Sequence, residues 1–323
     1  MMKFSMAELA ERTGGLITKQ SISRYEKGIM RPKRDALQAL AHALNISEAY
    51  FSGTNLPIDM PMLRTSSHGR LSPEELESIE SRLSFWAEQY LVKEREADFH
   101  THFENPVAGT EVRTLEDAIQ AAGLLRERWH CGDGPIPSIL RLMERKGIRI
   151  LSTDLPDDVL GLSTWANGIH PFVILEMRQE RTSVERLRYT AAHELAHLLL
   201  TFPEDSEFGV EKRCDLFAGF FLMPKRTFIE EMGAAHRDEV TLEEMIDLKN
   251  TYGLSLQALI IAARYYGIVS PEYKRWWYDK YPGANPMETG WGHYQYPETL
   301  GREKRIDSIV DYKKYEEEDG YAE

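Results

Sequence analysis

The residues whose types and spacing best suit chemistry are His193, Glu194 and His197. They lie in the segment Tyr189–Leu200, which contains no proline or glycine and consists mostly of good helix formers. Residues four apart share one face of a helix, so both imidazoles can bind a single metal ion. Glu194 lies one position further round, where its carboxylate can accept a proton from metal-bound water. The pattern predicts a zinc centre on a helix; the alternative is an amphipathic core helix with two incidental histidines.

A zinc centre with two histidines needs a third protein ligand, and a second segment offers one. The sequence predicts another helix over about 210–222, which ends before Pro224. Glu211 and Asp215 are four apart on this helix and share a face. Glu211 can supply the third ligand, and Asp215 can accept the free N–H of a ligating imidazole. An ordinary solvated pair of carboxylates is the alternative.

A small antiparallel sheet is expected ahead of the histidine helix. Residues 148–151 alternate as a strand, and residues 161–164 and 172–175 predict two more, with Asn167-Gly168 as the turn between them. Zinc peptidases of this general plan bind substrate backbone by adding a strand to a sheet edge. An ordinary structural strand is the alternative. The candidates for this substrate strand are Gly161, Leu162 and Ser163.

Residues 1–52 form a small basic module on an acidic chain. They contain eight Lys and Arg against five Asp and Glu, whereas the whole chain has a net charge of −13. A capping-box pattern at Ser5 begins one short helix, Gly14-Gly15 ends it, and Thr18–Lys27 predicts a second. A third helix is expected over Asp35–Leu44. This charge distribution is compatible with DNA contact at one end of the chain.

Residues 5–51 resemble the repressor-type helix-turn-helix of the Xre/Cro family. The resemblance rests on Ile22-Ser23-Arg24-Tyr25-Glu26-Lys27-Gly28 and on Ile29-Met30-Arg31-Pro32. In that family the second helix enters the major groove. The lead before Ser5 is shorter than in the family, so a truncated module used for protein contacts is the alternative. The DNA-facing positions that the resemblance implies are Thr18, Lys19, Gln20 and Arg24.

A second resemblance covers most of residues 110–270. The residues that carry it are the run Arg186–His197, Glu211, Cys214-Asp215, Phe217-Ala218 and Leu222-Met223-Pro224. They resemble the ImmA/IrrE metallopeptidase family. Cys214-Asp215 stands where the family usually has Ala-Asn, and it gives the Glu-x-x-x-Asp spacing of gluzincins. The resemblance implies a regulatory protease that cleaves a repressor, here fused to an Xre-type module.

The expected fold is α+β and mainly helical, with a helix-turn-helix module and a gluzincin-like metallopeptidase domain that contains the small sheet. Residues 53–71 contain many helix- and strand-breaking residues and predict a linker. The expected domain boundaries are 1–52 for the helix-turn-helix, 53–71 for the linker, 72–290 for the peptidase domain and 291–323 for a C-terminal extension with an acidic tail.

The expected function is that of a zinc-dependent regulatory endopeptidase. Zn²⁺ is expected on His193, His197 and Glu211, with Glu194 as the general base. One alternative is a DNA-binding antitoxin or transcriptional regulator that uses the peptidase fold to bind a partner without cutting it. Another is a self-processing repressor that is cut near residues 52–70.

Composition points to a soluble cytoplasmic protein. No apolar run approaches the ~20 residues that a membrane span needs, and the N-terminus lacks a signal-peptide core. Cys131 and Cys214 lie far apart in the sequence and indicate neither a disulfide scaffold nor a thiolate zinc site. Cys214 is expected to be a buried structural thiol, with oxidation sensing as the alternative. The expected partners are a repressor-like protein substrate, DNA through residues 1–52 and a second copy of the chain, without a membrane.

Overall fold

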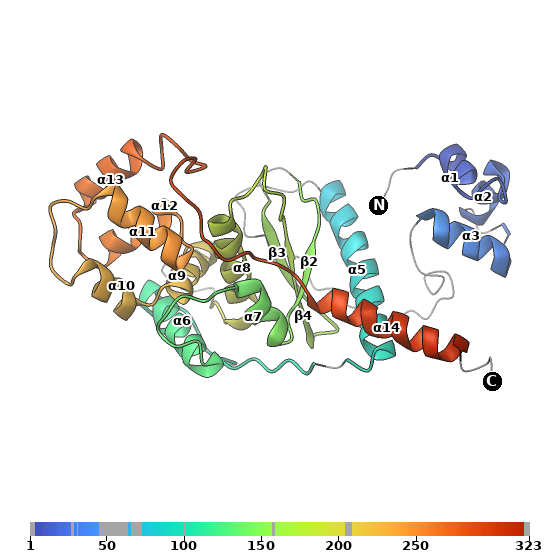
Figure 1. Ribbon diagram of the computed structural model, residues 1–323, viewed down its shortest axis with the longest axis horizontal. Coiled ribbons are helices and arrows are strands. Elements are labelled where there is room, and N and C mark those ends of the chain that lie inside the picture. The colour runs from blue at the N-terminus through green and yellow to red at the C-terminus, as the bar shows by residue number, and fades with distance from the viewer. Residues whose placement is uncertain are drawn as a thin grey trace. The chain divides into compact units, whose positions relative to one another are not determined.

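The chain divides into two compact units. The smaller unit takes its described residues from 1–58 and 81–92, and the larger takes them from 59–80 and 93–323. The long helix α5 (Pro73–Glu96) contributes to both. The computed structural model describes residues 4–26, 29–30, 32–44, 64–65, 73–99, 101–156, 159–203 and 209–319 (Figure 1).

The smaller unit contains the three short helices expected near the N-terminus. They are α1 (Met6–Arg12), α2 (Lys19–Glu26) and α3 (Arg34–Leu44). The capping box forms at the start of α1, where the Ser5 amide donates to the Glu8 carboxylate at 2.7 Å. Gly14 and Gly15 both have positive φ, which explains the two glycines in the turn. Three buried aliphatic side chains form the small core: Ile17, Ile22 and Leu40.

The larger unit contains a four-stranded sheet in the order β1-β3-β4-β2. Its strands are β1 (Arg64–Thr65), β2 (Arg149–Ser152), β3 (Gly161–Ala166) and β4 (His170–Leu175). β3 and β4 form an antiparallel hairpin, with Asn167 and Gly168 both at positive φ in the turn. This is the backbone conformation for which an Asn-Gly pair is favoured, so the sequence signal for this hairpin is confirmed.

The sheet is mixed rather than antiparallel throughout. β1 pairs with β3 antiparallel, but β2 pairs with β4 in parallel, with Arg149 opposite Phe172. β2 and β3 are consecutive in the sequence but are not neighbours in the sheet, because β4 lies between them. Local alternation of side chains cannot reveal such a crossover, because the alternation is the same in parallel and antiparallel strands.

Helices surround the sheet and account for most of the larger unit, so the expected α+β, mainly helical fold is confirmed (Figure 1). They are α6 (Leu115–Trp129), α7 (Ile139–Arg145), α8 (Val184–Leu199), α9 (Val210–Leu222), α10 (Lys225–Met232), α11 (Leu242–Tyr252), α12 (Leu256–Tyr265), α13 (Pro271–Lys280) and α14 (Arg302–Asp319).

Helix α8 occupies the centre of the larger unit. It packs against β3 and β4 on one side and against α9 on the other, and α9 in turn packs against α6. Small residues such as Ala192 and Ala196 are fully buried, which allows the neighbouring backbones to approach closely. On α9, the rings of Phe217 and Phe221 lie parallel with their centroids 5.7 Å apart. The packing fixes α8 on both faces.

The segment between α13 and α14 returns across the larger unit and is held there by buried ion pairs (Figure 1). Glu288 pairs with the buried Lys249 at 2.8 Å. At the start of α14, Arg302 pairs with Glu94 at 2.8 Å, and Glu94 also pairs with Arg149 at 2.6 Å. Residues near 300 therefore belong to the same packed unit as the sheet.

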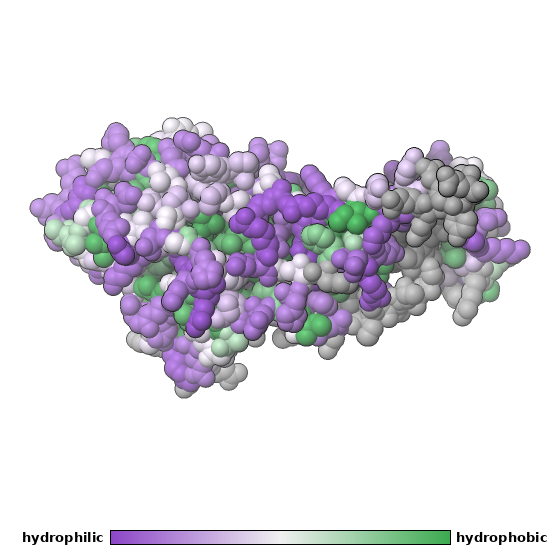
Figure 2. Space-filling view, turned by 60° about the horizontal axis from the view of Figure 1, so that its bottom comes forward, coloured by the Kyte–Doolittle hydropathy of each residue, from purple (hydrophilic) through white to green (hydrophobic). Residues whose placement is uncertain are grey.

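The surface in Figure 2 is mostly hydrophilic, and apolar side chains appear on it in small separate groups. Among the residues that the structure describes, no helix combines the length and the apolar composition that crossing a membrane requires.

Candidate metal centre

The three residues of the histidine motif lie in the buried C-terminal half of α8. Ser183 caps the start of this helix, and its hydroxyl accepts a hydrogen bond from the Arg186 amide at 3.2 Å. His193, Glu194 and His197 are 4%, 0% and 7% exposed. Burial of such polar groups costs about 1–3 kcal/mol each unless they find partners. Their partners therefore show what the site is built to do.

The ring nitrogens of His193 and His197 meet a carboxylate from α9. The two Nε2 atoms lie 3.1 Å apart. One oxygen of Glu211 lies 3.2 Å from His193 Nε2, and the other lies 3.4 Å from His197 Nε2. The structure thus brings together the three residues that the sequence spacing offered as ligands.

Asp215 orients the first of these histidines. Its carboxylate lies 2.9 Å from His193 Nδ1, one helical turn along α9 from Glu211. A carboxylate there accepts the Nδ1–H, which leaves Nε2 with its lone pair directed at the shared centre. Tyr189 ties the same region together, because its hydroxyl donates to the Asp215 backbone carbonyl at 2.6 Å.

The donor set fits a metal cation. With its proton on Nδ1, His193 presents an electron pair at Nε2 to a second ring nitrogen and to Glu211 within 3.2 Å. Electron-rich atoms this close repel one another unless a proton or a cation lies between them. Two imidazoles and one carboxylate form a set that divalent transition metals bind, with a position left for a further ligand.

Glu194 differs from the other buried carboxylates in having no partner in the described structure. Its side chain is fully buried, and neither carboxylate oxygen has a hydrogen bond among the described residues. An unpaired buried carboxylate is costly, so its retention needs a reason. A general base that receives a proton from water is such a reason. Glu194 therefore fits the role that the motif predicts.

Cys214 also lies at this centre. The ligand atoms of His193, His197 and Cys214 are all within 4.8 Å of one another, so this group can hold a metal ion. Burial, reinforced by nearby carboxylates such as Glu211, raises the pKa of the Cys214 thiol. The Glu211 oxygens contact both Nε2 atoms directly, at 3.2 and 3.4 Å. These contacts favour Glu211 as the third ligand.

The electrostatics of the centre favour positive charge. Burial acts to lower the pKa of His193, but hydrogen bonds to Asp215 and Glu211 outweigh it and raise that pKa to about 10. Burial acts to raise the pKa of Glu211, but hydrogen bonds with His193 and His197 lower it to about 2. Surroundings that stabilise a proton on a buried imidazole also stabilise a bound cation.

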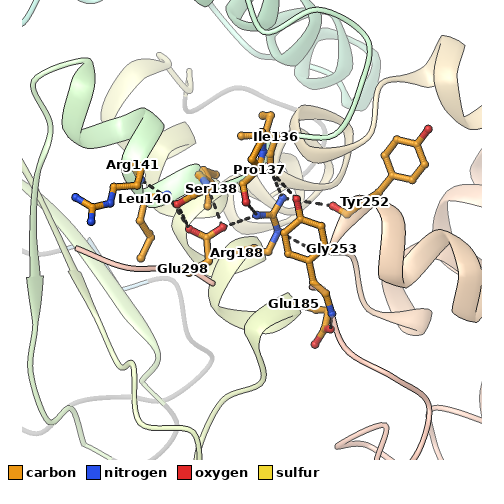
Figure 3. Close-up of polar contacts among 12 residues, drawn as sticks. Ile136, Pro137, Ser138, Leu140, Arg141, Glu185, Arg188, Tyr252, Gly253 and Glu298 are labelled. Atoms are coloured by element: carbon orange, nitrogen blue, oxygen red, sulfur yellow. Dashed lines mark hydrogen bonds and ion pairs between the residues drawn. The ribbon is translucent and has the colours of Figure 1, made fainter. Parts of the chain in front are cut away.

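A buried arginine that sequence reasoning missed fixes the other half of α8 (Figure 3). Arg188 is 0% exposed, and Figure 3 shows its guanidinium among backbone carbonyls and the carboxylate of Glu298. Arg188 lies among other charged and polar residues such as Glu185 and Arg186, so the local sequence does not indicate its burial. Its hydrogen-bond acceptors are Ile136 O, Pro137 O, Tyr252 O, Gly253 O and Glu298 Oε1.

Glu298 links Arg188 to the start of α7, where the Ser138 hydroxyl also donates to it at 2.6 Å. Besides pairing with Arg188, its carboxylate accepts from the amides of Ile139 and Leu140 at 3.0 and 3.1 Å, at the start of α7. Tyr294 stacks on the same guanidinium, with its ring centroid 4.0 Å from Arg188 Cζ. The segment before α14 thereby anchors the helix that carries both histidines. Nothing in the local sequence around Glu298 indicates this role.

The expected substrate strand lies against the metal centre. Gly161 begins β3, and a Cβ atom there would lie 2.5 Å from Thr190 Cγ2 and 3.2 Å from a Glu194 oxygen. Only glycine allows the strand to approach α8 this closely. Leu162 and Ser163 follow, both buried, and both are paired with β1 as well as with β4.

The positions implied to face DNA lie on the surface of the smaller unit. The Thr18 hydroxyl accepts from the Ser21 amide at 3.2 Å and so caps the start of α2. Because it caps the helix, its hydroxyl is only partly available to another partner. All four implied residues are exposed: Thr18, Lys19, Gln20 and Arg24.

Comparison with protein families matches two segments of the chain. Residues 1–51 match a helix-turn-helix family, and residues 143–264 match the IrrE N-terminal-like domain. No curated protein matches the chain. Both resemblances predicted from the sequence are confirmed. The chain thus joins a segment that matches a helix-turn-helix family to a segment that matches the IrrE N-terminal-like domain, in the order expected for the fusion.

Proposed function

We propose that this protein is a zinc-dependent regulatory endopeptidase that cleaves a repressor or another regulatory protein. The observation that carries the proposal is the convergence of His193, His197 and Glu211 beside the unpaired carboxylate of Glu194. Buried carboxylates with a structural role are nearly always hydrogen-bonded. The match of residues 143–264 to a peptidase-related family supports the same function.

Each residue has one role in this proposal. His193, His197 and Glu211 hold the zinc ion, and Asp215 keeps His193 in the tautomer that presents Nε2. When bound, zinc supplies Lewis-acid chemistry, which polarises the scissile carbonyl and makes water acidic near neutral pH. A carboxylate oxygen of Glu194 accepts the proton of the attacking water and returns it to the leaving amide nitrogen.

The surrounding elements supply specificity in the same proposal. Gly161, Leu162 and Ser163 of β3 align the substrate backbone beside Glu194. Residues 1–52 bring the peptidase to DNA through the exposed positions at and near the start of α2. A gel shift with the protein's own promoter tests this role, and no retardation at low salt contradicts it.

The peptidase assignment is tested with the Glu194→Gln variant. Wild type and variant are incubated with candidate repressors, the products are identified by mass spectrometry, and zinc is measured by elemental analysis. We expect the variant to keep its zinc and to lose about 10²- to 10⁴-fold in cleavage rate, because only the proton acceptor is removed. Glu243→Gln, on the exposed start of α11, is the matched control.

The outcomes separate the candidate functions. Cleavage that Glu194→Gln retains refutes the role of Glu194. Wild type that binds no zinc and cuts nothing, while still retarding promoter DNA, identifies the protein as a non-proteolytic regulator instead.

A further inference from the structure

β1 pairs with the edge of β3 to which the substrate backbone is proposed to bind. β4 pairs with one edge of β3 along its whole length, from Gly161 to Ala166. The opposite edge is paired with β1 at two positions, Arg64 opposite Ser163 and Thr65 opposite Leu162. These two positions of β3 belong to the strand that is expected to bind substrate backbone.

The direction of β1 carries it toward the proposed general base. As the chain advances from Arg64 to Thr65, the paired position on β3 retreats from Ser163 to Leu162. The next residue of β3 in that direction is Gly161, whose backbone lies against Glu194. β1 is thus antiparallel to β3 and points at the catalytic end of the strand.

β1 comes from the part of the sequence between the two segments that match protein families. Arg64 and Thr65 lie between the segment that matches a helix-turn-helix, residues 1–51, and the segment that matches the IrrE N-terminal-like domain, residues 143–264. The strand on the substrate edge is therefore part of the connection between the two modules.

We infer that β1 acts as an internal pseudosubstrate, which holds the substrate edge of β3 until a protein substrate or a change in the linker displaces it. The inhibitory consequence rests on the proposed peptidase function, whereas the strand pairing does not. Strand addition relies on backbone hydrogen bonds, so an unrelated substrate can compete for the same edge. A tethered segment competes at an effective concentration of about millimolar, which favours the internal strand.

The short length of β1 suits a reversible contact. Only two residue pairs join β1 to β3, compared with six between β3 and β4. A strand pair this short is only marginally stable by itself. β1 can therefore separate from β3 without disturbing the β3–β4 hairpin.

A peptide-binding experiment tests the inference without requiring catalysis. The probe is a fluorescein-labelled peptide with the sequence of residues 59–70, and binding is followed by fluorescence polarisation to full-length Glu194→Gln protein. Three forms are compared: β1 unchanged, Arg64→Pro/Thr65→Pro, and Arg64→Ala/Thr65→Ala. Proline removes the backbone donors of β1, whereas alanine keeps them and serves as the matched control.

We expect the peptide to bind the double-proline form at least 10-fold more tightly than either other form, because only there is the edge vacant. A probe peptide with both prolines is expected to bind none of the three. Equal affinity in all three forms overturns the inference, and so does failure of the probe to bind the double-proline form.

Hydrogen exchange gives an independent test that needs no proline variant. In Glu194→Gln protein with β1 unchanged, a fragment containing Arg64 and Thr65 is expected to hold at least one amide that exchanges 10-fold more slowly than in the free peptide. Exchange at the free-peptide rate overturns the inference. Neither test uses zinc or cleavage, so a failure of the peptidase assignment appears separately, in the Glu194→Gln cleavage experiment.

Discussion

The two halves of α8 treat buried charge in opposite ways. In the first half, Arg188 is fully buried and donates to four backbone carbonyls and to Glu298. In the second half, Glu194 is equally buried and its carboxylate has no hydrogen bond among the described residues. The same helix thus carries one buried charge that is hydrogen-bonded and one that has no hydrogen bond among the described residues.

Under the proposed function, the difference separates a structural charge from a catalytic one. A buried charge with every bond made stabilises one arrangement of the chain, and losing its partner is costly. A buried charge with no bond made destabilises the chain and is retained for chemistry. The contrast leads to a ranking of expected effects on the free energy of unfolding.

The largest effect is expected from Arg188→Ala. It leaves the Glu298 carboxylate buried without its charge partner and several carbonyls without donors, so we expect a loss of about 3–5 kcal/mol. Urea unfolding followed by circular dichroism measures it. Arg186→Ala, at an exposed position two residues away, is the control and should change stability by less than about 0.5 kcal/mol. Equal effects of the two variants would remove the distinction between the halves of α8.

An intermediate effect is expected at Glu176, a third buried carboxylate. Burial acts to raise its pKa, but hydrogen bonds from Arg178 and from the Leu155 amide lower it to about 2. Because the folded pKa lies below the unfolded value of 4.5, its stabilisation is present above pH 4.5 and is lost as pH falls toward 2. The shift corresponds to about 3 kcal/mol, reduced by the exposure of Arg178.

Unfolding curves measured between pH 7 and pH 2 check this prediction. Glu176→Gln should lower stability at pH 7 and flatten the fall in stability below pH 4.5. Glu180→Gln, at an exposed position nearby, should leave the wild-type curve unchanged. If Glu176→Gln loses stability below pH 4.5 as steeply as the wild type does, groups other than Glu176 cause that loss.

The smallest effect is expected at Glu194 itself and has the opposite sign. In metal-free protein, Glu194→Gln replaces an unpaired buried carboxylate with a neutral amide, so stability should stay the same or rise by about 1 kcal/mol. The measurement is the same urea titration, with chelator present. A loss of 2 kcal/mol or more would show that Glu194 has structural partners after all.

The residues that the sequence located are those linked by local spacing. His193 and His197 are four apart, as are Glu211 and Asp215, and helical periodicity alone places each pair on one face. The capping box at Ser5 is equally local, since its two partners are three residues apart. Such features need only the geometry of a single helix or turn, which is why they could be predicted.

The features that the sequence did not reveal depend on residues far apart in the chain. Arg188 and Glu298 are 110 positions apart, and no periodicity relates them. The parallel pairing of β2 with β4 depends on a crossover, and β1 arises from a segment rich in breakers. Tertiary packing decides these contacts, so a reading of local pattern assigns Arg188 no role and the connecting segment no strand.

Glu298 is synthesised long after Arg188, the buried charge that it neutralises. A ribosome makes Arg188 110 residues before it makes the carboxylate that neutralises it. Domains fold as they emerge, N-terminal parts first, so Arg188 on α8 lacks its charge partner until Glu298 has been made. A chain that stops before Glu298 is therefore expected to lack the buried ion pair that anchors the histidine helix.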